Sequence, residues 1–148
     1  MSLRTIVGAL VVSAAMTTGS GILGAQRPGD TLPASVGDLN AAQLIEIKDT
    51  NGQVLLHGTL KTSKNEPKET ERKAELESPT GQKAKGKFEV EIERKDGAIA
   101  KEEVELEVEK LPAMTECELF IDGKHVSSLT TTKVGKAELK LERKATTK

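Results

Sequence analysis

Apolar and charged residues alternate along most of the chain beyond residue 42. The alternation is strictest between Glu102 and Lys110, where Val104, Leu106 and Val108 are separated by single glutamates. Successive side chains of a strand point to opposite faces of its sheet, so a period of two predicts a strand with one face in a core. Similar patterns occur at 43–48, 53–60, 74–77, 85–94, 116–121, 124–131 and 136–144. We therefore predict an all-β domain of about seven to eight antiparallel strands.

Two of these stretches nearly repeat each other. Residues 86–95 and 135–144 share Gly, Lys, two Glu, Arg and Lys at matching positions. Each copy follows a pair of strands, so the chain divides into two units of a hairpin plus a strand. One such unit cannot bury its apolar face alone. An internal duplication, with both units around a single core, is therefore predicted.

Short turns predict how the strands pair. An Asn-Gly pair after residue 50 and an Asp-Gly pair after residue 121 are strong signals for tight hairpins. In the first hairpin, the apolar faces coincide if Ile47 lies opposite Leu56. In the second, the same reasoning places Leu119 opposite Val126 and Cys117 opposite Ser128.

The link at residues 95–101 predicts the topology. A hairpin that aligned Ile92 with Val104 would set Glu93 against Glu103, and like charges directly opposite each other destabilise a sheet. We therefore predict that this link crosses between two sheets, as in a Greek-key-like β-sandwich. Residues 61–73 are almost wholly polar and are predicted to be a solvated loop.

The N-terminus has the features of an export signal. Arg4 precedes an apolar run at 6–16, and small residues lead to a predicted cleavage after Ala25, which makes residues 1–25 a signal peptide. The apolar run is about half of the roughly 20 residues needed to cross a bilayer, so no membrane span is predicted. No cysteine lies near its end to carry a lipid anchor. We expect an exported protein, periplasmic or extracellular.

The remaining boundaries follow from composition. Residues 26–41 are rich in Pro, Gly, Asp and Ser and predict a flexible N-terminal arm. Residues 42–144 form a single predicted domain, and 145–148 a disordered tail.

Charge and aromatic content limit the partners. The chain has 22 basic and 23 acidic residues, and only 1% of its residues are aromatic, with no Trp or Tyr. This balance gives no global field for nucleic acid, and the usual stacking platforms for bases and sugars are missing. We predict no nucleic-acid partner and an unknown protein partner in the envelope or medium.

A row of carboxylates is the most unusual chemical feature. Glu103, Glu105, Glu107 and Glu109 share one strand face, with neighbours about 7 Å apart. Calcium takes six to eight oxygens, usually gathered by a loop, so a flat row is a poor cation site. We interpret it as a solvated stripe, so that no metal residues are assigned. The alternative is a cation or small-ligand binding module that uses the Glu103 to Glu109 face.

The remaining candidates favour structural roles. Cys117, the only cysteine, shares a strand face with apolar residues and is predicted to be a buried, inert thiol, with an intermolecular disulfide or a reactive thiol as the alternative. His57 is expected opposite Glu46 on the polar face, and His125 on the face away from Cys117, which excludes a thiolate pair. The sequence has no phosphate loop or hydrolase motif. We predict a non-catalytic protein without cofactors, structural or interactive in role.

One segment resembles known proteins. It comprises Leu111-Pro112, Thr115, Ile121-Asp122-Gly123, Val126, Thr130-Thr131, Gly135 and Ala137. This pattern is similar to a recurrent β-sandwich segment in exported bacterial proteins of unknown biochemical role. The resemblance implies an exported β-sandwich and brings no catalytic residues.

Overall fold

The structure is a computed structural model that describes residues 30–144. Within this range the regular elements are all strands, ten in number. They are β2 (Asp30–Thr31), β3 (Leu44–Asp49), β4 (Val54–Thr59), β5 (Lys61–Glu66), β6 (Glu69–Glu77), β7 (Lys85–Lys95), β8 (Ala98–Glu109), β9 (Glu116–Ile121), β10 (Lys124–Thr130) and β11 (Ala137–Lys144). No helix in this part of the chain is long and apolar enough to cross a membrane.

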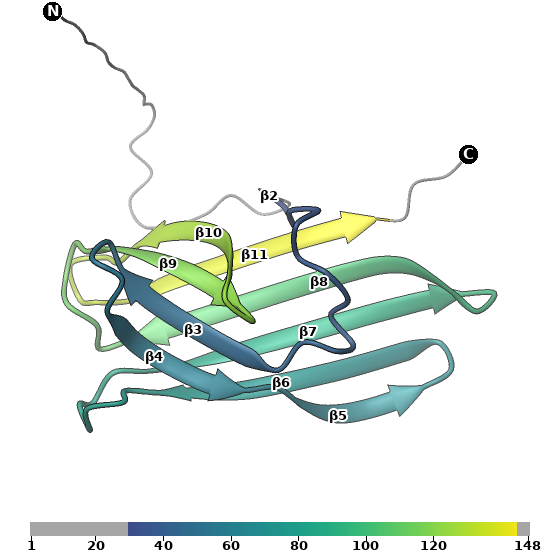
Figure 1. The fold of residues 1–148 in the computed structure, drawn as a ribbon, viewed down its shortest axis with the longest axis horizontal. Coiled ribbons are helices and arrows are strands. Elements are labelled where there is room, and N and C mark those ends of the chain that lie inside the picture. The colour runs from purple at the N-terminus through teal and green to yellow at the C-terminus, as the bar shows by residue number, and fades with distance from the viewer. Residues whose placement is uncertain (1–29, 145–148) are drawn as a thin grey trace, which may run out of the picture.

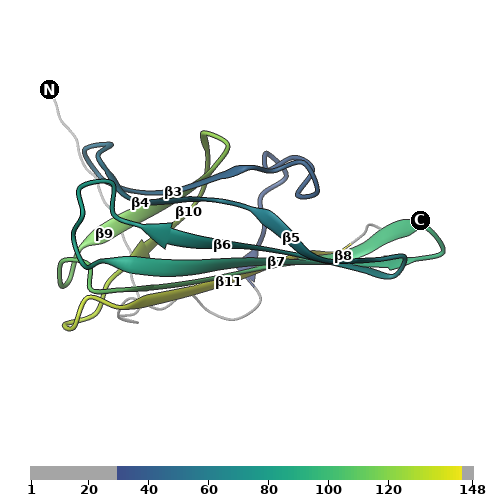
Figure 2. The ribbon, with the colours of Figure 1, turned by 90° about the horizontal axis from the view of Figure 1, so that it is seen from below.

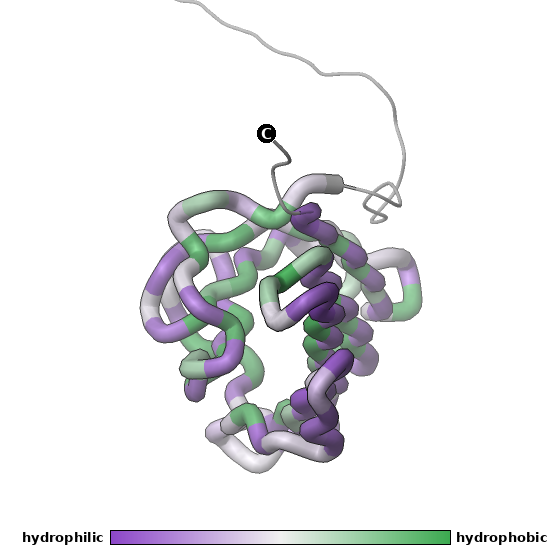
Figure 3. Tube along the Cα trace, turned by 90° about the vertical axis from the view of Figure 1, so that its right-hand side faces the viewer, coloured by the Kyte–Doolittle hydropathy of each residue, from purple (hydrophilic) through white to green (hydrophobic). Residues whose placement is uncertain are grey.

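The strands form one continuous sheet rather than two. Its order is β10-β9-β3-β4-β6-β7-β8-β11-β2, with β5 added beside β6, and only the short β11–β2 pair is parallel. Seen nearly along the strands, the chain forms a ring around the core, so the sheet almost closes into a barrel (Figure 3). The all-β prediction is confirmed. The two separate sheets of the predicted sandwich are not seen in the described residues.

The first predicted hairpin is confirmed, and the second is partly wrong. Ile47 lies opposite Leu56 in β3–β4, as predicted. In β9–β10 a bulge shifts the register between His125 and Ser127, so that Cys117 faces Leu129 instead of Ser128. The bulge adds one residue to β10 and lets both Val126 and Leu129 point inward, although they are three positions apart.

The predicted crossover after β7 is wrong, because β7 and β8 form a direct hairpin (Figure 1). Asp96 and Gly97 both have positive φ, the conformation of a tight two-residue turn. The register differs by two residues from the one considered, so Glu93 faces Lys101, but Glu91 lies directly opposite Glu103 and Glu89 opposite Glu105, the kind of contact that was expected to forbid the hairpin. Such a like-charge pair costs about 0.2–1 kcal/mol, whereas each apolar side chain buried on the inner face contributes about 1.5–3 kcal/mol. Burial therefore decides the topology.

The predicted loop at 61–73 is also wrong, because these residues form the β5–β6 hairpin. The period of two was hidden because the inward positions of β6 include Thr70 and Arg72, which are polar yet buried. In Figure 2 the ends of the β5–β6 and β7–β8 hairpins extend past the ring as a flat sheet. These two hairpins therefore make the sheet longer than the barrel that encloses the core.

Residues 32–42 run from β2 across to β3 and are packed against the core (Figure 1). Leu32, Val36 and Leu39 are each at most 3% exposed. This differs from the flexible arm predicted for 26–41, because three apolar residues without periodicity were not recognised as core. Residues 26–29 of that arm, the predicted signal peptide and the predicted tail at 145–148 lie outside the described residues.

Arginines on the inner face of the sheet hold this segment. Arg72 is buried, and its Nη1 donates to the carbonyl oxygens of Leu39, at 2.8 Å, and of Ala42. Arg143 donates through Nη1 to the carbonyl of Val36 at 2.8 Å and through Nε to the buried Glu102 carboxylate at 2.8 Å. Carbonyl groups that water would otherwise solvate are thus satisfied inside the fold. We call these two arginines and Arg94 the arginine clasp.

The third arginine of the clasp explains part of the sequence repeat. Arg94 donates to Asn40 Oδ1 at 3.2 Å and to Thr70 Oγ1 at 2.7 Å. Arg94 and Arg143 occupy matching positions of the two ten-residue stretches. The strands that carry them, β7 and β11, flank β8 on its two sides. Each stretch therefore supplies three apolar residues to the core and then an arginine to the segment.

The substitution Arg143→Met should lower the free energy of unfolding by about 3 kcal/mol, because it leaves Glu102 buried without its cation. Urea denaturation of the variant and the wild type measures the difference. Lys144→Met is the matched control, since Lys144 is exposed and adjacent, and should cost less than about 0.5 kcal/mol. Equal effects of the two substitutions would contradict a role for Arg143 in holding the segment.

Candidate functional site

The predicted carboxylate row lies where the alternation placed it, on the outer face of β8. Glu103, Glu105, Glu107 and Glu109 point away from the core, and lysines of β8 itself and of the neighbouring strands β7 and β11 reach the two ends of the row. Lys101 and Lys140 lie 3.2 and 3.7 Å from Glu103, and Lys85 lies 3.5 Å from Glu109. The row is therefore partly neutralised, as expected of a solvated stripe.

Glu103 is the most shielded member of the row. Burial opposes its ionisation, but the hydrogen bond from Lys101 and the charges of Lys101 and Lys140 outweigh burial and hold the pKa of Glu103 below its ordinary value. The same hydrogen bond raises the pKa of Lys101. Glu103 is thus a stable anion of the outer face.

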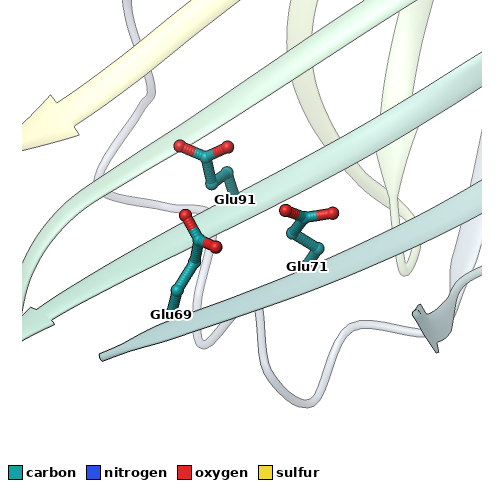
Figure 4. A group of neighbouring side chains, drawn as sticks. All are labelled: Glu69, Glu71 and Glu91. Carbon is teal, nitrogen blue, oxygen red and sulfur yellow. The ribbon is translucent and has the colours of Figure 1, made fainter. Parts of the chain in front are cut away.

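A second group of carboxylates was missed by sequence reasoning. Glu69 and Glu71 of β6 and Glu91 of β7 point toward one another, with carboxylate oxygens within 4.8 Å (Figure 4). Burial, together with the charges of Glu69 and Glu103, raises the pKa of Glu91 above its ordinary value. Sequence reasoning had placed Glu69 and Glu71 in a loop. The signal that could have found them is the alternation of Glu69 and Glu71 with the inward Thr70 and Arg72.

These three glutamates are the described residues best placed to share a cation. A depression of about 130 Å³ lies beside them, and Glu71 and Glu91 line it together with Glu103 and Lys73. Lys64 already pairs with Glu69, and that hydrogen bond raises the pKa of Lys64. The group is half-buried and faces solvent, so it can act as a patch of negative charge.

A larger groove of about 520 Å³ crosses the outer face near the other end of the same strands. It is lined by residues of both signs, including Lys85, Glu109 and Lys136, and its floor includes Gly86. A Cβ at Gly86 would lie 2.7 Å from the carbonyl oxygen of Glu107, so glycine permits the close strand approach there. Its mixed charges do not select one ligand class.

The predicted burial of Cys117 and the predicted positions of the two histidines on the outer face are confirmed, although Cys117 faces Leu129. Cys117 is buried, and burial, with smaller effects of Asp49 and Glu116, raises its pKa to about 11. A thiol with that pKa is a poor nucleophile at neutral pH. His57 is exposed opposite Glu46. His125 contacts Phe120 edge-on, with ring centroids 5.5 Å apart, away from the thiol.

Comparison of the chain with family models, with curated proteins and with solved structures gives no match.

Glu91→Gln and Glu103→Gln should have opposite effects on stability at pH 7. The raised pKa of Glu91 means that its ionisation destabilises the folded state, so removing the charge should raise the free energy of unfolding by about 0.2–1 kcal/mol. The lowered pKa of Glu103 means that its ionisation stabilises the folded state, so removing that charge should cost up to about 1 kcal/mol.

The effect of Glu91→Gln should vanish once the pH is below the ordinary glutamate pKa of 4.5, and the effect of Glu103→Gln should vanish only at a lower pH, because the folded-state pKa of Glu103 lies below 4.5. The cost of ionising Glu91 is absent below that value, and the contribution of Glu103 is lost as the pH falls through its lower folded-state pKa. Thermal melts from pH 7 to about pH 3 measure this. Shifts of the same sign for the two variants at pH 7 would overturn the assignment.

Proposed function

We propose that this is a non-catalytic exported protein that acts through its outer surface, in a structural or protein-binding role in the periplasm or medium. The observation that supports the proposal most directly is the use of the buried polar side chains. The buried polar residues Thr70, Arg72, Glu102 and Thr131 each bond to other parts of the chain, and so serve the fold. The polar groups left to meet a partner are those of the outer face.

The outer face of β6–β8 is the surface that fits such a role best. Glu105 and Glu107 are exposed there, and Glu69, Glu71 and Glu91 extend the negative charge across β6 and β7. The partner class it suits is a basic protein surface, because complementary charge raises association rates and excludes acidic competitors. Export rests on Arg4, the apolar run at 6–16 and the small residues before Gln26. The likeness of residues 111–137 to exported β-sandwich segments supports the same location.

Export and binding are tested together in the host cell. Fractionation should find the protein outside the cytoplasm, with an N-terminus at Gln26 by peptide sequencing. In pull-downs from the same fraction, the wild type should retain a partner that Glu105→Lys/Glu107→Lys does not, because charge reversal turns attraction into repulsion. Lys73→Glu, an exposed change on the same face, is the control and should retain it.

A full-length cytoplasmic protein would contradict export. Identical capture by the wild type and by Glu105→Lys/Glu107→Lys would contradict binding through this face.

Cation binding at the outer carboxylates is the alternative. It would use the Glu103 to Glu109 face or, beside it, Glu69, Glu71 and Glu91, whose carboxylate oxygens converge from β6 and β7. A ligand that binds only the folded state raises its melting temperature. Calcium that stabilises the wild type but not Glu91→Gln would favour the alternative, whereas an unchanged melting temperature would favour the protein-binding role.

A further inference from the structure

The topology gathers four connections at one end of the barrel. They are residues 50–53, 78–84, 110–115 and 131–136, which join β3 to β4, β6 to β7, β8 to β9 and β10 to β11. In Figure 1 they lie together at the left-hand end. These connections contain four lysines and no acidic residue, in a chain where acidic residues slightly outnumber basic ones. We call this end the lysine tip.

The lysine tip also presents apolar side chains to solvent. Val134 is 70% and Met114 53% exposed, which makes them the two most exposed large apolar residues of residues 31–144. They lie on two adjoining connections, since the Met114 N–H donates to Thr132 O and the Leu111 N–H to Gly135 O, both at 3.1 Å. Lys110, Lys133 and Lys136 are exposed on the same two connections.

The exposure of these side chains is fixed by the fold and does not come from a loose end. Thr131 is buried, and its Oγ1 donates to Pro112 O at 2.6 Å and accepts from the Thr115 N–H at 2.8 Å. Met114 itself has a positive φ of 52°, a conformation that residues other than glycine rarely adopt unless the surrounding structure holds them in it. The apolar side chains are therefore held outward by a rigid base.

The acidic residues closest to the lysine tip lie on the ends of the strands, and two of them already have hydrogen-bond or ion-pair partners. Asp49 accepts the N–H groups of Asn51 and Gln53, both at 2.9 Å, and Glu109 pairs with Lys85. The outward-facing Glu77 and Glu116 stand on strand ends next to the connections. The four connections themselves therefore carry charges of one sign only, those of their lysines.

From this arrangement we propose that the lysine tip docks on an anionic lipid surface. Exposed apolar side chains surrounded by lysines suit the boundary between lipid headgroups and acyl chains. At this boundary the apolar side chains insert among the acyl chains, and the lysines bind the lipid phosphates. Complementary charge selects the lipid surface, because the connections carry no carboxylate to be repelled. The near-neutral total charge of the chain does not oppose this, since the attraction acts within about one Debye length of the tip. The docking does not depend on the outer carboxylates of the proposed function.

Vesicle co-sedimentation tests this proposal. The protein is used from Gln26 onward, because the core comprises residues 32–141 and the apolar run at 6–16 would bind lipid by itself. The wild type should sediment with vesicles of equal parts phosphatidylglycerol and phosphatidylcholine, much less with phosphatidylcholine alone, and less as salt is raised. Binding to phosphatidylcholine alone at equal strength, or to neither kind of vesicle, would overturn the proposal.

Variants separate the tip from the rest of the charged surface. Met114→Ser/Val134→Ser should weaken binding to the anionic vesicles by about tenfold or more. Removing three tip lysines, as Lys110→Gln/Lys133→Gln/Lys136→Gln, should weaken it at least as much. The matched control removes three exposed lysines from turns at the opposite end, as Lys68→Gln/Lys95→Gln/Lys124→Gln.

The control should bind within about twofold of the wild type, since its lysines lie beyond the screening length from the tip. Equal weakening by the control and the tip variants would show that binding is a property of total charge, and would sink the proposal. Melting temperatures within the error of the wild type confirm that each variant is folded. The outer-face variant Glu105→Lys/Glu107→Lys should still bind vesicles, so failure of the proposed protein-binding face and failure of the tip are distinguishable.

Discussion

The sheet curls into a nearly closed barrel, but some of its strands extend beyond the closed part. There the inner face of the sheet has no opposite wall, so another segment of the chain must cover it. Here the cover is residues 32–42, and the arginine clasp fixes it to the inner face through Arg72, Arg94 and Arg143. Guanidinium groups suit this task because each offers five donors in a rigid fork, and one arginine can satisfy several carbonyls at once. The apolar side chains of the segment then fill the space beneath, as Leu32, Val36 and Leu39 do. Without the clasp, backbone carbonyls would be buried without partners, at about 1–3 kcal/mol each.

The difference between the inner and outer positions of the strands also explains why the charges lie on the outer face. Inner positions are given to apolar residues and to polar groups that bond within the chain, so the carboxylates of β6, β7 and β8 are left to gather on the outer face. Repulsion among them is tolerated because it is weak beside the burial that sets the register. Lys101 and Lys140 offset part of it at Glu103. Surface charge therefore follows from the fold, and the acidic face and the lysine tip occupy different regions.

Alternation was enough to predict most of the strands, the outward row of glutamates and the buried Cys117. It failed where an inward position was polar, as at Thr70 and Arg72, since their hydrogen-bond partners come from distant parts of the chain. It also failed at the β7–β8 hairpin, where the charge conflict was given more weight than the Asp-Gly turn and the two buried apolar pairs, Phe88 with Leu106 and Val90 with Val104. The segment at 32–42 has no period at all, so its place in the core depends on tertiary contacts alone. The group of Glu69, Glu71 and Glu91 was missed because the polar residues Thr70 and Arg72 at inward positions hid the strand β6, as they hid the β5–β6 hairpin.

Native-state hydrogen exchange at the Leu32 amide measures most directly whether residues 32–42 belong to the cooperative core. This N–H donates to the Glu142 carbonyl oxygen at 2.9 Å, at the point where the segment leaves β11. If the segment is integral, Leu32 should exchange only through global unfolding, with the same free energy as the amides that pair β7 with β8. Exchange at the rate of an unprotected peptide, while β7 and β8 stay protected, would show that the segment detaches and that the clasp does not hold it.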